Sequence, residues 1–576
     1  MKNRRQKHER SSSFTGNSHR KSTNKKEAQI KIEKKEIDSV EDEIKRLNKA
    51  IEVSKQQIQA LYQHTLKNIG QEEAKIFEAH MMILDDPEYF GQVQQKIKTE
   101  KINAEYALKQ VTDAFIEIFQ NMDNEYMKER ALDIKDVSDR IIRQLLGIKT
   151  VDLSKLDEEV IIIAEDLTPS DTAQMDKQKV IGFITETGGR TSHSAIMART
   201  LEIPAIVGVE GIIANVKNGD IIIFDGDEGS VIINPDKETL KQYKDKKEKY
   251  EQFQNELKQL KGKPSITKDG CKVEIVGNIG TPNDIEGLIK NDAEGVGLYR
   301  TEFIYMDRDT LPTEEEQFEA YKKVLQAMNP KPVVIRTLDI GGDKEVSYLN
   351  IDKEMNPFLG YRAIRLCLDK VEIFKVQLRA LLRASIYGNL KIMFPMISSL
   401  EELLEAKKIL QEVKRDLDSE GVEYASNIEV GMMIEVPSAA IISDILAKEV
   451  DFFSIGTNDL IQYTTAVDRM NQKIRHLYNP FNPAVIRLIK MVIDNGHKQG
   501  IWVGMCGEMA GDPKLIPILI GMGLDEFSMS PISILRARRI IRNIERKEME
   551  KIANQIIDLP TAEEVERFID ENIAID

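Results

Sequence analysis

The chain has 576 residues, of which 41% are hydrophobic and 31% charged, and its formal net charge is −15. This composition is typical of a soluble globular protein with three to four domains, and the acidic balance argues against a general nucleic-acid-binding protein. No apolar run approaches the roughly 20 residues of a membrane-spanning helix, and no apolar stretch follows the basic N-terminus as in a signal peptide.

Residues 1–28 are basic and rich in Ser and Asn, with almost nothing apolar beyond Met1 and Phe14. Such a stretch cannot bury enough surface to offset the entropy of ordering. We therefore expect an atypical, disordered N-terminal segment.

From about residue 36 to residue 147 the pattern is helical. Apolar residues recur at three-to-four-residue spacing between charged ones, as at Ile44, Leu47, Ile51, Ile58 and Leu61. Asp86-Pro87 interrupts the pattern between two helical segments. Residues 29–147 are therefore predicted to form a small helical bundle.

After residue 147 the sequence pattern changes to short runs of β-branched residues separated by turn residues, such as "EVIIIAEDL", "VIGFITE" and "DIIIFDGDEGSVIINP". This pattern predicts a compact α/β domain over 148–235. Residues 236–264 are strongly charged with few apolar positions, which is typical of a solvated helical linker.

Residues 265–576 alternate apolar strands with amphipathic helices. Eight strand–helix units in this length match a TIM barrel, although a doubly wound sheet could alternate in the same way. The barrel is favoured because nearly every strand ends in a polar or glycine-rich cluster, where such barrels place their chemistry. The predicted strands are "KVEIVGNIG", "GVGLYRTEF", "PVVIRTLDIGG", "LKIMFPMI", "IEVGMMIEVP", "DFFSIGTNDL", "IWVGMCGEMAG" and "LDEFSMS".

Polar side chains at these strand ends would converge on one mouth of a closed barrel; they are Arg300, Arg336, Glu435, Asn458, Asp459, Arg469 and Cys506. Arginines presented together favour phosphate or carboxylate, and the carboxylates of Glu435 and Asp459 suit Mg²⁺. The predicted ligand carries phosphate and carboxylate and binds with magnesium. Cys506, in the Gly-flanked loop "GMCGEMAG", becomes a candidate for proton transfer.

His193 is one of seven histidines and follows a glycine turn in "GGRTSHSAIMAR", where a helix is predicted to begin. A helix N-terminus offers free N–H groups and a positive dipole end to an anion. A neutral imidazole in the first turn could therefore attack phosphorus and leave the phosphoryl group among preformed donors. The other histidines are interpreted as structural or merely exposed; they are His8, His19, His64, His80, His476 and His497.

Several long motifs carry a family resemblance: "GGRTSHSAIMARTLEIPAIVG", "EGVGLYRTEFIYMDR", "MNPFLGYRAIR", "DFFSIGTNDLIQYTTAVDR" and "GMCGEMAGDP". From about residue 29 to the C-terminus the chain closely resembles Enzyme I of the bacterial phosphoenolpyruvate-dependent sugar phosphotransferase system. The resemblance implies phosphoryl transfer from phosphoenolpyruvate to a histidine of the enzyme and then to a histidine of the carrier protein HPr. It also implies that a swivelling α/β phosphohistidine domain contains the helical HPr-binding bundle as an insertion, and that the barrel binds phosphoenolpyruvate and forms a homodimer.

Matching the motifs residue by residue gives each candidate a role. His193 would be phosphorylated, Cys506 would donate a proton, and Arg300 and Arg336 would hold the phosphate. Asn458 and Arg469 would contact the substrate, with Glu435 and Asp459 as Mg²⁺ ligands. Three widely spaced cysteines, too few for a disulfide framework and without zinc-site spacing, agree with a cytoplasmic enzyme.

The N-terminus departs from the family pattern, because the usual glycine-rich apolar strand is replaced by a basic polar stretch. A missing strand would leave an exposed sheet edge and an unfilled core beside the site. One alternative is therefore an impaired protein that still binds HPr. A second is an enzyme like pyruvate phosphate dikinase or phosphoenolpyruvate synthase, although the 150 or so residues before the α/β domain are helical and lack a phosphate-binding glycine loop. Contact of the basic tail with nucleic acid is a third and weaker alternative.

Overall fold

The computed structural model describes residues 18–24, 32–68, 71–120, 125–148, 156, 158–173, 175–176, 179–188, 195, 198, 203–226, 228–306, 308–342, 344, 346–349, 351–352, 354–471 and 473–574. The chain divides into two compact units, Met1–Gln252 and Phe253–Asp576. Within the described residues, no helix is both long enough and apolar enough to cross a membrane.

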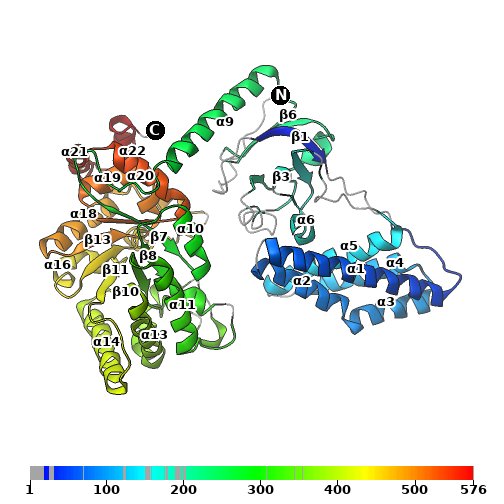
Figure 1. Ribbon diagram of the computed structural model, residues 1–576, viewed down its shortest axis with the longest axis horizontal. Coiled ribbons are helices and arrows are strands. Elements are labelled where there is room, and N and C mark those ends of the chain that lie inside the picture. The colour runs from blue at the N-terminus through cyan, green and yellow to red at the C-terminus, as the bar shows by residue number, and fades with distance from the viewer. Residues whose placement is uncertain are drawn as a thin grey trace. The chain divides into compact units, whose positions relative to one another are not determined.

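The first unit contains a bundle of long helices (Figure 1), with α1 at Val40–Asn68, α2 at Gln71–Leu84, α3 at Pro87–Glu100, α4 at Ala104–Gln120 and α5 at Glu125–Leu146. The predicted apolar face is confirmed, since Leu47, Ile58 and Leu61 are buried in the bundle core. The Asp86 carboxylate caps α3 by accepting the N–H groups of Glu88 and Tyr89, and Pro87 occupies the first helical position.

The α/β part of this unit is a six-stranded sheet in the order β4-β3-β2-β1-β5-β6. Its strands are β1 (Ser18–Asn24), β2 (Val160–Ala164), β3 (Val180–Thr185), β4 (Ala205–Ile206), β5 (Ile221–Asp225) and β6 (Ser230–Ile233). Two short helices, α6 (Pro169–Ala173) and α8 (Ile212–Asn215), belong to the same part. The bundle follows β1 and precedes β2, so the predicted insertion of a helical bundle into an α/β domain is confirmed.

The prediction that residues 1–28 are disordered is wrong for residues 18–24, which form β1. This strand lies inside the sheet, parallel to β2, with Ser22 opposite Ile161, and antiparallel to β5, with Ser18 opposite Phe224. The expected loss of a strand therefore does not occur. The reason is that ladder hydrogen bonds join backbone groups, so a strand with apolar neighbours on both sides can be polar in sequence. Residues 1–17 and 25–31 lie outside the described residues.

Helix α9 (Lys237–Lys258) follows β6, as the predicted linker helix requires. Near the middle of the helix, the Lys246 ammonium contacts Asp225 at 2.5 Å and Glu228 at 2.6 Å. These two acceptors raise the pKa of Lys246, although burial opposes the effect. Near its end, Arg539 stacks over the ring of Phe253 and contacts Glu256 at 3.8 Å.

The second unit is a closed barrel in the order β10-β11-β12-β13-β14-β7-β8-β9, and every neighbouring pair is parallel. All eight predicted strands are present: β7 (Glu274–Ile279), β8 (Val296–Arg300), β9 (Pro332–Arg336), β10 (Asn389–Phe394), β11 (Glu429–Ile434), β12 (Phe452–Ile455), β13 (Trp502–Met505) and β14 (Glu526–Met529). Pairing of β14 with β7 closes the sheet and excludes the doubly wound alternative.

Helices surround the barrel (Figure 1) and bury their apolar faces against the strands. They are α10 (Ile285–Lys290), α11 (Glu314–Met328), α12 (Ile364–Asp369), α13 (Val371–Ala384), α14 (Leu400–Glu420), α15 (Pro437–Ile441), α16 (Ser443–Leu446), α17 (Thr457–Thr465), α18 (Pro483–Lys498), α19 (Leu515–Met522), α20 (Ile534–Asn543), α21 (Arg546–Ile556) and α22 (Ala562–Asn572). Inside the barrel a separate apolar cluster includes Leu298, Val334, Phe452 and Cys506.

Candidate active site at the mouth of the barrel

The carboxyl ends of the parallel strands bring most of the predicted site residues to one mouth. Arg300 and Arg336 are the last residues of β8 and β9 and lie opposite each other in the ladder. Glu435 directly follows β11, Asp459 lies in the first turn of α17, and Cys506 directly follows β13. This is the end of a TIM barrel where catalytic groups collect.

Arg336 is held between two buried carboxylates. Its Nη2 donates to both oxygens of Glu302 at 2.9 and 3.1 Å, and its Nη1 lies 2.9 Å from Asp339 Oδ2. The Nε atom is buried, and no residue that the structure describes accepts a hydrogen bond from it. These contacts therefore fix the orientation of the guanidinium.

Four charged residues that strand-end reasoning missed complete the cluster: Glu302, Asp339, Lys344 and Arg362. Lys344 Nζ lies 2.8 Å from Glu302 and 3.6 Å from Asp339. Arg362 reaches the mouth from the long segment after β9, and its own backbone neighbour Ala363 has a left-handed φ of 51°. The sequence signal for Arg362 was its place in the motif "MNPFLGYRAIR", since it does not lie at a strand end.

A glycine lets Arg362 approach. Gly341 has a φ of 106°, and a Cβ there would lie 2.6 Å from Arg362 Cβ. Any side chain at this position would be strained and would push Arg362 away from the mouth. Close packing thus explains the first glycine of the doublet in "DIGGDK", whereas the second, Gly342, is favoured by its φ of 72°.

Glu435 and Asp459 form a pair of acidic groups suited to a divalent cation. Burial, followed by the charges of Asp459 and Asp339, raises the pKa of Glu435 to about 8. Its Oε1 accepts the N–H of Met396, a residue in the left-handed region with a φ of 56°. Mg²⁺ is commonly bound by one or two carboxylates together with substrate oxygens and water, and a cation here would relieve the repulsion between these carboxylates.

Cys506 is 3% exposed at the carboxyl end of β13, where it belongs to the apolar cluster inside the barrel. Its N–H donates to Ile455 O at 3.1 Å, and its carbonyl accepts from Asn278 Nδ2 at 3.1 Å. Burial raises the pKa of the Cys506 thiol to about 11, whereas Ser454 and Arg336 oppose the shift. The group is therefore a protonated thiol at neutral pH and can act as an acid.

Asn458, Arg469 and Arg300 lie in more open positions. Asn458 Oδ1 accepts the N–H of Glu508 at 3.1 Å, and Arg469 Nη1 lies 3.2 Å from Asp459 Oδ1. Arg300 makes no ion pair with any residue that the structure describes, so its guanidinium can meet an anionic ligand.

His193 lies outside the described residues, so its predicted role stays a prediction. The strand and turn that lead to it are described. Thr185 Oγ1 donates to Thr187 O at 2.7 Å, and Thr187 Oγ1 donates to Glu165 O at 2.8 Å. Gly188, the first glycine of the predicted turn, has a φ of 101°, which confirms its need for glycine.

The other histidines that the structure describes with their side chains are engaged or exposed. His80 is fully buried, with Nε2 3.3 Å from Asp133, and His497 Nε2 lies 2.8 Å from Asp525. His64 and His476 are exposed. The side chains of His8 and His19 lie outside the described set.

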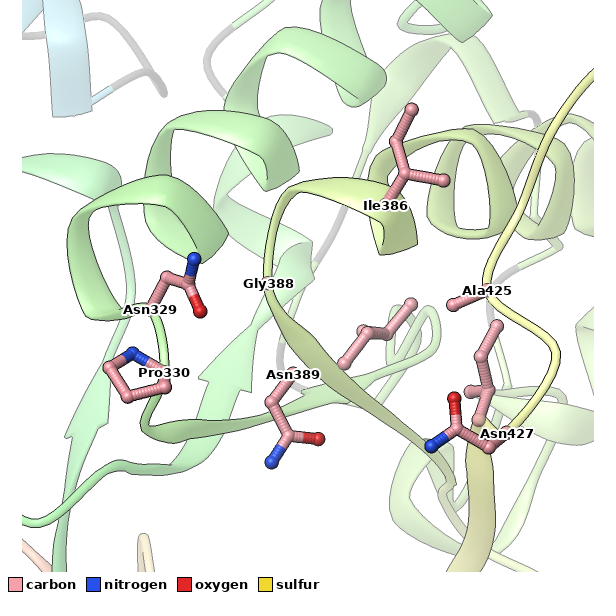
Figure 2. A pocket seen from close by; sticks show the side chains of 9 residues that line it. Asn329, Pro330, Ile386, Gly388, Asn389, Ala425 and Asn427 are labelled. Atoms are coloured by element: carbon pink, nitrogen blue, oxygen red, sulfur yellow. The ribbon is translucent and has the colours of Figure 1, made fainter.

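A pocket of 390 Å³ lies at the opposite end of the barrel (Figure 2). Asn329, Asn389 and Asn427, beside the amino ends of β9, β10 and β11, line it together with Pro330 and Leu390. None of the predicted site residues lines this pocket, so we assign the chemistry to the charged mouth.

Comparison with known proteins identifies the family. The chain matches the PEP-binding domain of PEP-utilising enzymes over residues 254–546, their N-terminal domain over 15–130 and their mobile domain over 156–229. The phosphoenolpyruvate-protein phosphotransferase of Geobacillus stearothermophilus is 58% identical over 94% of this chain and 93% of its own length. The chain belongs to the phosphoenolpyruvate-protein phosphotransferase family.

Other members of the phosphotransferase family are similarly close. The protein of Bacillus subtilis is 56% identical over 95% of this chain and 96% of its own length. A solution NMR structure of Enzyme I is 48% identical over 41% of this chain and 97% of that chain, with a TM-score of 0.38. The relatives from Geobacillus stearothermophilus and Bacillus subtilis show that the chain is an enzyme and confirm the expected resemblance.

Proposed function

We propose that this enzyme transfers the phosphoryl group of phosphoenolpyruvate to its own His193 and then to a histidine of HPr, the first step of the sugar phosphotransferase system. The observation that carries the proposal is a charged cluster that fixes the guanidinium of Arg336 in the same barrel mouth as a protonated thiol at Cys506. The cluster suits the phosphate and carboxylate of the substrate, and the thiol suits the enolate that remains after transfer.

Arg300 and Arg336 hold the phosphate, and Asn458 and Arg469 contact the rest of the substrate. Positioning and charge neutralisation supply most of what phosphoryl transfer requires. Glu435 and Asp459 would hold Mg²⁺, which when bound neutralises charge on the substrate oxygens.

In the chemical step, His193 Nε2 forms a bond to phosphorus while the bond from phosphorus to the enol oxygen breaks. The electron pair of that bond remains on the leaving enolate. Cys506 then gives its proton to the methylene carbon, which yields pyruvate, and the thiolate regains a proton from water. For His193 to visit both the barrel and HPr, the α/β domain must swivel, and α9 is the segment that connects it to the barrel.

We also propose that the enzyme is a cytoplasmic homodimer associated through the barrel. All three cysteines are free thiols, which agrees with a reducing compartment. Met355 and Leu359, after β9, and Met470, after α17, are 96%, 64% and 65% exposed, so these apolar side chains are accessible to a partner surface. Sedimentation of the purified full chain tests this association.

Labelling with phosphoenolpyruvate tests the main proposal. Radiolabelled phosphoenolpyruvate and Mg²⁺ should place an acid-labile label on the wild-type chain and on His476→Ala, and none on His193→Ala. Added HPr should discharge the label. A folded wild-type chain that takes no label, or a His193→Ala chain that keeps it, would overturn the proposal.

The same assay separates the two alternatives. An impaired HPr-binding protein would retain HPr in a binding assay without accepting label. A dikinase-like enzyme would show ATP-dependent exchange of label with pyruvate, and we expect none. The position of β1 inside its sheet, between β2 and β5, favours a competent α/β domain over the impaired alternative.

A further inference from the structure

Gln377 is a buried polar residue on α13, outside the charged mouth, and it is 1% exposed. Its Oε1 accepts the backbone N–H of Leu338 at 2.8 Å. Its Nε2 donates to Thr301 Oγ1 and to Tyr321 OH, both at 3.1 Å. The oxygen and the nitrogen of the Gln377 carboxamide are therefore both hydrogen-bonded. An unpaired polar group at this buried position would lower the stability of the fold.

These bonds join the ends of two strands. Thr301 directly follows β8, and its hydroxyl donates onward to Arg336 O at 2.9 Å. The backbone of residues 336–338 is thus held on both sides: the carbonyl of Arg336 by Thr301 and the N–H of Leu338 by Gln377. The ladder between β8 and β9 has a register shift between Val296 and Tyr299, so the side-chain bridge adds a constraint that the irregular ladder lacks.

The bridged segments carry the groups of the phosphate site. Arg300 and Glu302 flank Thr301, and Asp339 follows Leu338 directly. Since Glu302 and Asp339 together orient the Arg336 guanidinium, a shift of either strand end would turn that guanidinium.

We propose that Gln377 is a positioning residue for phosphoenolpyruvate, acting through Thr301 and the backbone of residues 336–338 to set the geometry of Arg300 and Arg336. This inference rests on the proposed function, because it takes the two arginines as phosphate ligands. A glutamine is required because only a carboxamide presents one acceptor and two donor hydrogens in this arrangement. A carboxylate would need Thr301 to donate to it, which would release Arg336 O.

The farther side of the network holds Gln377 in turn. Tyr321 OH donates to Gln317 Oε1 at 3.1 Å, and Tyr305 OH donates to the same oxygen at 3.0 Å. Gln317 Nε2 donates to Pro312 O at 3.3 Å. Two residues of α11, Gln317 and Tyr321, therefore hold the carboxamide of Gln377 in place. The hydrogen-bond network runs from α11 through Gln377 on α13 to Thr301 at the site.

The test compares Gln377→Leu and Thr301→Val with Leu378→Ala in the full chain. A structural role alone would reduce the folded, active fraction and lower the maximal rate, whereas the KM for phosphoenolpyruvate would not move. Positioning raises KM, because misplaced ligand groups lose binding; a displacement near 1 Å can cost about 100-fold, and we expect a rise of about 10-fold. Leu378, fully buried on the same helix, makes the matched control, which should be destabilised with an unchanged KM.

A double variant tests that the bridge acts as one unit. Gln377→Leu and Thr301→Val both break their shared bond, so the double variant should raise KM by less than the product of the two single increases; a rise equal to that product would show that the two residues act independently. If Gln377→Leu fails to fold, Thr301→Val, which keeps the side-chain shape, gives the same KM readout.

Arg336→Gln separates this inference from the proposed site. If Arg336→Gln raises KM and folded Gln377→Leu and Thr301→Val stay within about twofold of wild type, positioning by Gln377 is refuted while the site stands. If Arg336→Gln itself leaves KM unchanged, the assignment of the phosphate ligand is wrong and the inference falls with it.

Discussion

The Nη2 atom of Arg362 lies 2.8 Å from Oδ1 of Asp339, and each of these side chains is 2% exposed. The same nitrogen lies 3.3 Å from Asp459 Oδ2. One guanidinium thus compensates two buried carboxylates that come from different strand ends. It ties the side of the mouth proposed for phosphate, around Arg336, to the side proposed for the metal.

Arg362→Met should damage both stability and activity. Removing one partner of a buried ion pair leaves an uncompensated charge, which typically costs ~3–5 kcal/mol. Trp502 is the only tryptophan of the chain and lies in β13, so its fluorescence during urea unfolding reports on the barrel. We expect a lower midpoint and a severe loss of phosphoenolpyruvate turnover.

Two further variants sharpen this prediction. Arg362→Lys keeps the charge but loses the planar fork that reaches both carboxylates, so it should recover stability more than activity. Arg415→Ala, an exposed arginine on α14, is the control and should leave both properties unchanged. A wild-type midpoint and rate in Arg362→Met would refute the role of the bridge.

Stability of the barrel should fall as pH rises because of Glu526. This carboxyl, on β14, is buried, and burial followed by the charge of Glu274 raises its pKa to about 8, with Glu429 and Asp525 adding to the effect and Lys391 opposing it. The folded state holds this proton more tightly than the unfolded chain, whose glutamates titrate near 4.3. The contribution is therefore complete below that pH and is lost as pH rises through 8.

Glu526→Gln removes this titration. The free energy of unfolding of the variant, relative to that of wild type, should increase by a few kcal/mol as pH rises from 5 to 9. This is the amount that a shift of several pKa units represents. Urea unfolding followed by Trp502 fluorescence at pH 5, 7 and 9 measures the difference. Glu423→Gln, at an exposed position, is the control, and its stability should depend on pH as that of wild type does. If the stability of Glu526→Gln also has the pH dependence of wild type, Glu526 does not titrate with a raised pKa.

The barrel could be predicted from sequence because each of its strands is apolar and ends in a recognisable polar cluster. Arg336, Glu435 and Asp459 were found for the same reason, since a parallel strand delivers its last residues to the mouth. Arg362 was not found in this way, because it reaches the mouth from a long irregular segment and not from a strand end. Asp339 was also missed: its role depends on burial between arginines, and burial of a single charged residue leaves no periodic signal.

Strand β1 was missed for a different reason. Its sequence, "SHRKSTN", contains no apolar residue, so neither alternation nor a buried run marks it as a strand. Its place is set by the backbone groups of β2 and β5, which need a partner between them. Pairing of this kind is decided by topology, and a local sequence window cannot show it.

A proline within β1 should therefore loosen the α/β domain and leave the barrel intact. Ser22→Pro removes a backbone donor from a strand with neighbours on both sides, where proline is not tolerated. We expect faster amide hydrogen exchange in β2 and β5, with an unchanged Trp502 unfolding curve. Ser12→Pro, upstream of the strand, is the control. Unchanged protection of β2 and β5 in Ser22→Pro would show that β1 does not support this sheet.

Cys506 should behave as a slow nucleophile and an effective acid. Because the pKa of its thiol is raised to about 11, little thiolate exists at pH 8, and the thiolate is the form that iodoacetamide attacks. Cys367 is buried, and its pKa is raised as well, whereas Cys271 is partly exposed. Mass spectrometry after brief alkylation of the native enzyme should find Cys271 modified first. Modification of Cys506 as fast as Cys271 would contradict the raised pKa.

The same pKa predicts how the reaction depends on pH. An acid must be protonated to act, so a raised pKa keeps Cys506 competent through pH 9, where a thiol of ordinary pKa would already be ionising. Cys506→Ala should lower the rate of pyruvate formation by about 10²–10⁴-fold, the usual contribution of a positioned acid. Coupled assay of pyruvate release from pH 7 to 9 measures both effects, and the Cys367→Ala control should retain the wild-type rate. Since water must then protonate the enolate, a Cys506→Ala enzyme with the wild-type rate would assign the proton to another group.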